Sequence, residues 1–181
     1  MKMKAWNKSW VASFTAIGLM SLFLLNANAG EMVMGGNSPR LSMKAEAVKA
    51  AVTKLGHKVT EFKDAKGNPH FVFDKTVENV KDIAIFMEDC GDAGCMDLVL
   101  YADFGVVKKI KPEQLNNWNH ISNMQRSKAF RSGSVDGEGP VGLSMAVSFL
   151  GDSELDQDRL AMQIGLFLVE VGIFSSGIDL L

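Results

Sequence analysis

Residues 80–104 read VKDIAIFMEDCGDAGCMDLVLYADF. On either side of its two cysteines, large apolar residues occupy every second position. Because side chains alternate between the two faces of a strand, each run predicts a β-strand with one buried face. The segment Cys90-Gly-Asp-Ala-Gly-Cys95 between them suits a short loop, so the stretch predicts an antiparallel hairpin.

The rest of the mature chain extends this pattern. A first helix is predicted with Ser42 as its N-cap and Gly56 as its C-terminal stop. The other predicted elements are strands near 58–63 and 70–74, a helix opening at Lys111-Pro112-Glu113, strands near 129–136 and 141–149, and a final helix over 160–174. The order α-β-β-β-β-α-β-β-α predicts an α+β domain in which helices flank an antiparallel sheet. One face of the strand at 141–149 holds only small residues, so that face has room for a closely packed helix or backbone.

The final helix is apolar around most of its circumference. Only Gln163 and Glu170 are strongly polar between Leu160 and Phe174, and with Asp156 they form one narrow stripe. Such a helix is buried on several sides, so we expect it to pack on the sheet. Its apolar part spans about 22 Å and follows charged residues, which argues against a membrane span. The remaining apolar surface is predicted to meet a partner or a second copy of the chain.

The N-terminus resembles a secretory signal. Three lysines and no acid precede the apolar run Trp10–Leu25, and small residues then lead to a cleavage site between Ala29 and Gly30. An uncleaved N-terminal anchor is the alternative. The predicted organisation is a signal peptide at 1–29, a flexible polar lead-in at 30–40, and one domain at 41–181. We expect the mature chain to be periplasmic or secreted, without stable membrane insertion.

The charge of the mature chain limits its partners. Removal of the signal leaves 16 lysines and arginines against 21 acids, a net charge of −5. Nucleic-acid binding requires a basic footprint, which this composition lacks. Attraction to anionic lipid is disfavoured for the same reason.

The two cysteines, Cys90 and Cys95, are predicted to form a disulfide, because an even pair this close oxidises readily outside the cytoplasm. A bridge over so short a loop contributes only about 2 kcal/mol, so it would mainly set the register of the hairpin. A redox pair is the alternative. The spacing is not Cys-x-x-Cys, and no flanking basic residue would lower a thiol pKa.

The second half of the chain resembles a known family. A helix beginning Leu115-Asn-Asn-Trp-Asn119, a charged segment through Phe130-Arg131, an alternating strand, the turn Gly151-Asp-Ser-Glu154 and a long apolar helix together resemble the YbjN family. The likeness covers roughly residues 40–178. It implies a fold similar to that of type III secretion chaperones, often dimeric, and a role as a sensory transduction regulator. The family implies no catalytic residues. The signal peptide and the cysteine pair depart from its cytosolic members.

One polar cluster is a candidate binding patch. Asn116 and Asn119 flank Trp118 on a helix, although asparagine is a poor helix former. The cluster predicts either a site for a peptide or small ligand, or asparagines that bond to neighbouring backbone while Trp118 lies in the core.

Other chemistry has weaker support in the sequence. The three histidines lack zinc-ligand spacing, and the acids around the cysteines lack calcium-loop spacing. Most of the mature chain's methionines fall in predicted elements, where they fill core gaps rather than bind copper. Asp136 and Glu138 are a weak glycosidase pair, and no nucleophile motif is present in the sequence. We therefore expect no cofactor and no metal.

These patterns favour a non-enzymatic binding or regulatory module that acts through protein–protein contacts and that is able to form a homodimer. An enzyme with an unrecognised site and a chaperone-like envelope protein are the alternatives. A deep pocket of titratable groups would favour an enzyme, and a shallow apolar surface with a polar rim would favour binding.

Overall fold

The computed structural model describes residues 41–74, 77–107, 110–120, 125–132, 139–148 and 150–177. In these ranges the elements are α1 (Ala45–Lys54), β1 (Val59–Lys63), β2 (Pro69–Phe73), β3 (Asp82–Gly91), β4 (Gly94–Asp103), α2 (Pro112–Trp118), β5 (Lys128–Arg131), β6 (Val141–Ser148) and α3 (Glu154–Gly177). The predicted α+β class and element order are confirmed. The predicted signal peptide, its cleavage site at Ala29 and Gly30, and the lead-in lie outside the described residues.

The strands form one open antiparallel sheet in the order β1-β2-β3-β4-β6-β5. Four of its five strand pairs join consecutive strands along the chain. The exception is β6, which inserts between β4 and β5 and places Met145 opposite Leu100. The centre of the sheet is therefore built from both halves of the chain.

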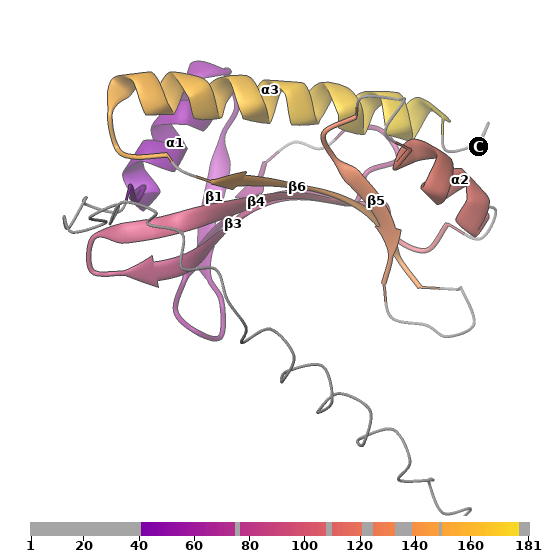
Figure 1. The fold of residues 1–181 in the computed structure, drawn as a ribbon, viewed down its shortest axis with the longest axis horizontal. Coiled ribbons are helices and arrows are strands. Elements are labelled where there is room, and N and C mark those ends of the chain that lie inside the picture. The colour runs from indigo at the N-terminus through magenta and orange to yellow at the C-terminus, as the bar shows by residue number, and fades with distance from the viewer. Residues whose placement is uncertain are drawn as a thin grey trace, which may run out of the picture. The chain divides into compact units, whose positions relative to one another are not determined.

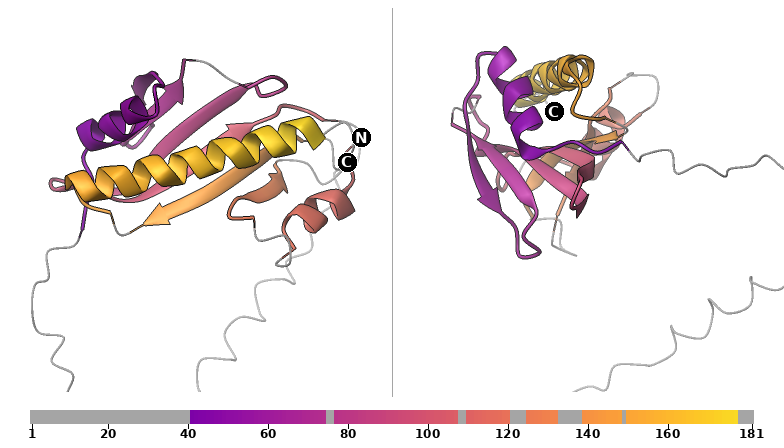
Figure 2. Two further views of the ribbon diagram at one scale, coloured as in Figure 1. Left: turned by 90° about the horizontal axis from the view of Figure 1, so that it is seen from above. Right: turned by 90° about the vertical axis from the view of Figure 1, so that its left-hand side faces the viewer.

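Helices α1 and α3 cover one face of this sheet, and α3 runs along it (Figures 1 and 2). The large apolar residues that alternate along β2, β3, β4 and β6 point to these helices, and they are buried with the inner residues of α3. The fully buried side chains include Phe71, Ile85, Leu100, Leu143, Phe167 and Phe174. No described helix lies on the opposite face (Figure 1), which we call the open face.

The predicted hairpin forms with a turn of two residues, Asp92 and Ala93, because Gly91 and Gly94 already pair across the strands. The predicted disulfide is present, joining Cys90 to Cys95 with their Cα atoms 3.9 Å apart.

The prediction that Ser42 caps the first helix is wrong. Helix α1 begins at Ala45, after Lys44, and the Ser42 hydroxyl donates to the carbonyl of Ala93 instead. The cause is Met43, which pairs with Cys95 through two backbone hydrogen bonds of 2.9 Å and is therefore held extended. The predicted stop at Gly56 is confirmed by its φ of +76°.

Among the described helices, α3 is long and apolar enough to cross a membrane by length and composition. A core helix passes the same test, and α3 packs on the sheet as expected. Its inward apolar residues are Leu160, Ile164, Phe167, Val171 and Phe174.

The polar stripe of α3 faces other parts of the protein. The Glu170 carboxylate accepts the backbone N–H groups of Arg126 and Ser127 at 3.0 and 2.8 Å. The Arg126 guanidinium donates to the side chain of Gln163. The stripe therefore ties α3 to the segment before β5. Between Met162 and Ile173, the exposed residues of α3 are all apolar.

Candidate functional site

The open face consists of every second residue of the strands. On β6 these are Gly142, Ser144, Ala146 and Ser148, the small residues that leave room for a closely packed helix or backbone. No described helix uses this room, because α3 covers the other face of β6, where larger side chains such as Leu143 offer more apolar area to bury. The surface of the open face is therefore formed by the outward-pointing side chains of the strands themselves.

A row of aromatic rings crosses the open face from one edge of the sheet to the other. Phe62 of β1 lies 5.5 Å from His70 of β2, and His70 lies 5.4 Å from Phe86 of β3, between ring centroids. Phe86 lies 6.0 Å from Tyr101 of β4, which lies 6.0 Å from Phe130 of β5. We call these five residues the aromatic row. Such a row offers a continuous apolar surface of rings.

The row is continuous because β6 contributes a glycine where the row crosses it. Gly142 pairs with Phe130 in the ladder between β5 and β6. A Cβ at position 142 would lie 2.9 Å from Cζ of Phe130 and 3.2 Å from Cε2 of Tyr101. Any side chain there would separate these two rings, so Gly142 allows them to approach across the intervening strand.

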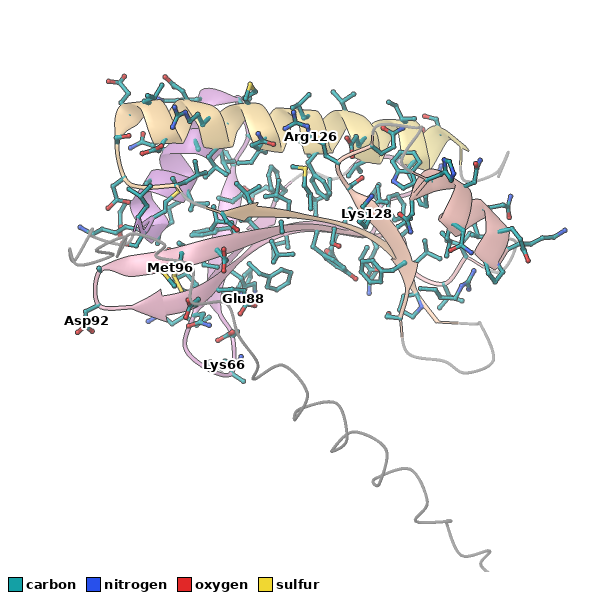
Figure 3. The ribbon with its side chains drawn as sticks, viewed as in Figure 1. Lys66, Glu88, Asp92, Met96, Arg126 and Lys128 are labelled. Carbon is teal, nitrogen blue, oxygen red and sulfur yellow. A yellow bond between two sulfur atoms is a disulfide. The ribbon has the colours of Figure 1, made fainter. Side chains whose placement is uncertain are left out.

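Two pairs of carboxylates lie at the ends of the central strands. Asp82 is directly opposite Asp103, and Glu88 is directly opposite Asp97. All four alternate with buried core residues and so point to the open face, where Figure 3 shows Glu88 on the side of the sheet away from α3. We call these the acidic pairs. Like charges directly opposite each other destabilise a sheet, so neither pair is explained by the stability of the fold.

One lysine lies close to the acidic pairs. The ammonium group of Lys81 is 3.4 Å from Asp103, although the Lys81 side chain is 67% exposed. Within the described ranges, no basic side chain forms an ion pair with Asp82, Glu88 or Asp97. Three of the four carboxylates of the acidic pairs thus have no ion-pair partner among the described residues.

The first acidic pair, Asp82 and Asp103, also affects the neighbouring Tyr101. Partial burial raises the pKa of the Tyr101 phenol, and the carboxylates of Asp103 and Asp82 raise it further. Both effects disfavour the phenolate. At neutral pH, Tyr101 therefore presents a neutral hydroxyl beside one acidic pair.

His70 acts in the row as an aromatic ring. Its imidazole stacks on Phe62 and on Phe86, with ring planes inclined by 23° and 19°. Its Nδ1 atom is buried without a hydrogen-bond partner in the described structure. Since the stacked rings direct their faces at one another, the free ring surface is greatest at the end of the row, where Phe62 is 49% exposed.

The residues of the predicted binding patch do not form one surface. Trp118 is buried, and its ring packs edge-on against Phe174 at 5.0 Å. The side-chain amide of Asn119 donates to the carbonyl of Ala129 and accepts from its N–H, at 2.8 and 2.7 Å, which ties α2 to β5. Only Asn116 is exposed. The three residues thus have separate positions, and two of them have structural contacts.

A hollow of about 470 Å³ lies beside the C-terminal end of α1 and is lined by Lys49, Thr53, Gly56, His57, Lys58, Val59 and Asp74. The Lys49 ammonium group already pairs with the Glu61 carboxylate, which raises the pKa of Lys49. The Thr53 hydroxyl donates to a helix carbonyl. In the described part of the chain, no cluster of three or more histidine, cysteine or carboxylate side chains is placed to hold a metal ion. Two of the polar side chains that line this hollow thus already have partners within the protein.

A second exposed apolar surface runs along α3. It consists of Leu155, Met162, Leu166, Val169 and Ile173, whose exposed fractions range from 38% to 60%. We call these residues the α3 stripe. It lies on the helix side of the sheet and so is separate from the open face.

Comparison with known proteins gives no match to a family model, to a curated protein or to a solved structure. The fold and site define the chain only as an α+β protein with an aromatic sheet face that none of its described helices covers. The likeness to the YbjN family stays a prediction.

Proposed function

We propose that the chain is an exported, non-enzymatic module that binds a protein or peptide segment on its open face. The observation that carries the proposal is the aromatic row, continuous over five strands on the side that no described helix covers. Aromatic side chains combine large contact area with few rotatable bonds, and they are enriched in binding surfaces. A shallow apolar surface with a charged rim suits binding better than bond-breaking chemistry.

The export part of the proposal is supported by two independent features. The first residues have the pattern of a secretory signal. The cysteine pair, Cys90 and Cys95, is placed for a disulfide at the tip of a hairpin, which suits an oxidising compartment. Together they favour a role in the periplasm or outside the cell.

The competing explanation is that the aromatic row only stabilises the sheet. Cross-strand aromatic pairs contribute about 0.2–1 kcal/mol each, so a row has some structural value without any partner. Phe62 separates the two explanations. It is 49% exposed at the end of the row, so its ring contributes little to the core.

The test is site-specific photocrosslinking in living cells. A photoreactive residue at Ala146, which is exposed on the open face, is compared with one at Val169, which is exposed on α3. We expect Ala146 to give discrete adducts with another protein and Val169 not to give the same ones. The double substitution Phe62→Ala and Phe86→Ala should remove the Ala146 adducts, whereas Val106→Ala, an equally exposed apolar position, should leave them.

Two results would argue against the proposal. Adducts that persist in the double variant would show that the row makes no contact with the partner. A broad smear of many unrelated chains from Ala146 would favour the chaperone-like alternative instead of a specific module.

A further inference from the structure

We propose that the segment held on the open face is an extended cationic peptide, with an apolar or aromatic residue between two basic residues about six positions apart. This inference rests on the proposed function and adds the chemistry of the partner. It starts from charge. From Asp82 to Asp103 the β3–β4 hairpin contains six carboxylates and no lysine, arginine or histidine.

The spacing of the acidic pairs sets the spacing in the peptide. Asp82 and Glu88 are six residues apart on β3, and their partners Asp103 and Asp97 are six apart on β4. At about 3.3 Å per residue, the two pairs are separated by roughly 20 Å. The aromatic row crosses between them. A peptide lying along the two strands therefore meets carboxylates, then rings, then carboxylates.

Charge complementarity indicates that the partner segment is positively charged. In each pair the two carboxylates repel each other, because they project side by side from adjacent strands. Lys81 partly neutralises the first pair, whereas Glu88 and Asp97 have no basic partner in the described chain. Glu88 and Asp97 are both half-buried, so salt screens their repulsion less than it would at a fully exposed site. A basic side chain from a partner would relieve this repulsion.

Other ligand classes fit the open face less well. An anionic polymer would be repelled by the carboxylates. A sugar that stacks on rings needs free ring faces, and in this row Phe62, His70 and Phe86 turn their faces to one another. Calcium takes six to eight oxygen ligands, and two carboxylates supply at most four.

The experiment uses the full mature protein with its disulfide intact and three synthetic peptides of about nine residues. All three peptides have a phenylalanine at the centre. They carry two arginines, two glutamines or two glutamates, placed six positions apart. Binding is measured by calorimetry at low and at high salt. We expect the arginine peptide to bind at least about tenfold more tightly than the glutamine peptide, with an affinity that falls as salt rises.

Variants locate the binding. The double variant Asp82→Asn and Glu88→Gln should lose the preference for the arginine peptide, whereas Glu113→Gln, an exposed acid on α2, should keep it. Equal affinity for the arginine and glutamine peptides would overturn this inference and leave the proposed function intact, provided that Phe86→Ala still weakens both. Failure of all three peptides to bind would also overturn it, and the photocrosslinking result would then decide the proposed function separately. Tight binding of calcium alone, lost in the double variant, would replace the peptide by a metal ion.

Discussion

Tyr101 is the single tyrosine of the chain, so its titration reports on one position of the open face. Burial, Asp103 and Asp82 all raise its pKa above the ordinary value of 10.0. We predict that the double variant Asp82→Asn and Asp103→Asn lowers the Tyr101 pKa towards that value, because two negative neighbours are removed. The measurement is the ultraviolet absorbance of tyrosinate as a function of pH.

The control for this titration is Glu88→Gln. Glu88 is at the other end of β3 and does not contribute to the Tyr101 pKa, so its removal should leave the titration unchanged. The raised pKa of Tyr101 also predicts how the stability of the protein changes at alkaline pH. The folded state holds the phenolic proton more tightly than the unfolded state, so this contribution is present below pH 10 and is lost as the pH rises through the folded pKa. Equal titrations in the wild type and the Asp82/Asp103 variant would contradict the assignment.

Asp156 predicts the opposite dependence at acid pH. The Ser153 hydroxyl donates to its carboxylate at 2.6 Å and lowers the Asp156 pKa, and Gly151 and Arg159 lower it further. Ser153 also caps α3, because its Oγ accepts the Asp156 N–H. A depressed folded pKa stabilises the protein above the ordinary value of 3.8, and this contribution is lost as the pH falls through the folded pKa.

Ser153→Ala should therefore have two effects. It should lower the free energy of unfolding at neutral pH by about 1 kcal/mol, as loss of a helix cap does. It should also make stability depend less steeply on pH in the acid range. Urea denaturation from neutral to acid pH measures both effects, and Ser176→Ala at the exposed end of α3 is the control. An unchanged acid dependence would show that Ser153 does not set the Asp156 pKa.

At the scale of single elements, the α3 stripe predicts self-association. An antiparallel pair of α3 helices centred on Val169 would place Leu166 against Gly172, and Ile173 against Gly165, of the second copy. Large residues would thus meet small ones along the contact. The sequence-based expectation of a homodimer consequently acquires a specific contact to test.

We expect the mature chain to sediment as a dimer and Val169→Glu to sediment as a folded monomer with an unchanged circular dichroism spectrum. Val169 is 60% exposed, so the charge disturbs no core contact, but in the dimer two glutamates would meet at the symmetry axis. Val106→Glu, at a similarly exposed position, should remain dimeric. A wild-type chain that is monomeric at every concentration would contradict the pairing.

The elements themselves were largely predictable from the sequence. Alternation of apolar residues assigns the faces of β3 and β4 correctly, because the side-chain period of a strand is two. Pro112 marks the start of α2, and Gly56 the end of α1. The start of α1 was not predictable, because a long-range pair, Met43 with Cys95, overrides the local preference of Ser42 for a cap.

The candidate site was not predictable for a related reason. The sequence shows an aromatic residue on the open side of several strands, which is the only local signal of the row. Whether these rings meet depends on strand order and register, such as the pairing of His70 with Phe86. It also depends on Gly142 lying between Tyr101 and Phe130, which required the insertion of β6. The position of Trp118 in the core, in contrast, follows from the apolar stripe of α2.

At the scale of the whole molecule, the proposed export predicts the mass of the protein isolated from its cells. The protein isolated from its cells should lack residues 1–29, and non-reducing mass spectrometry should find it lighter by the two hydrogen atoms that the Cys90–Cys95 disulfide removes. The same chain made in a reducing cytoplasm without residues 1–29 is the control, and it should retain both thiols. An intact Met1 together with free thiols in the native protein would contradict export and the oxidised compartment together.

The insertion of β6 between β4 and β5 also governs how the chain reaches its final shape. Until residues 141–148 are available, β4 is paired only with β3 and β5 has no partner, because β6 pairs with both β4 and β5. A chain that stops short of Val141 therefore exposes one edge of β4 and an unpaired β5, and it cannot complete its core. The sheet can therefore be completed only after the strand at residues 141–148, late in the chain, has been made.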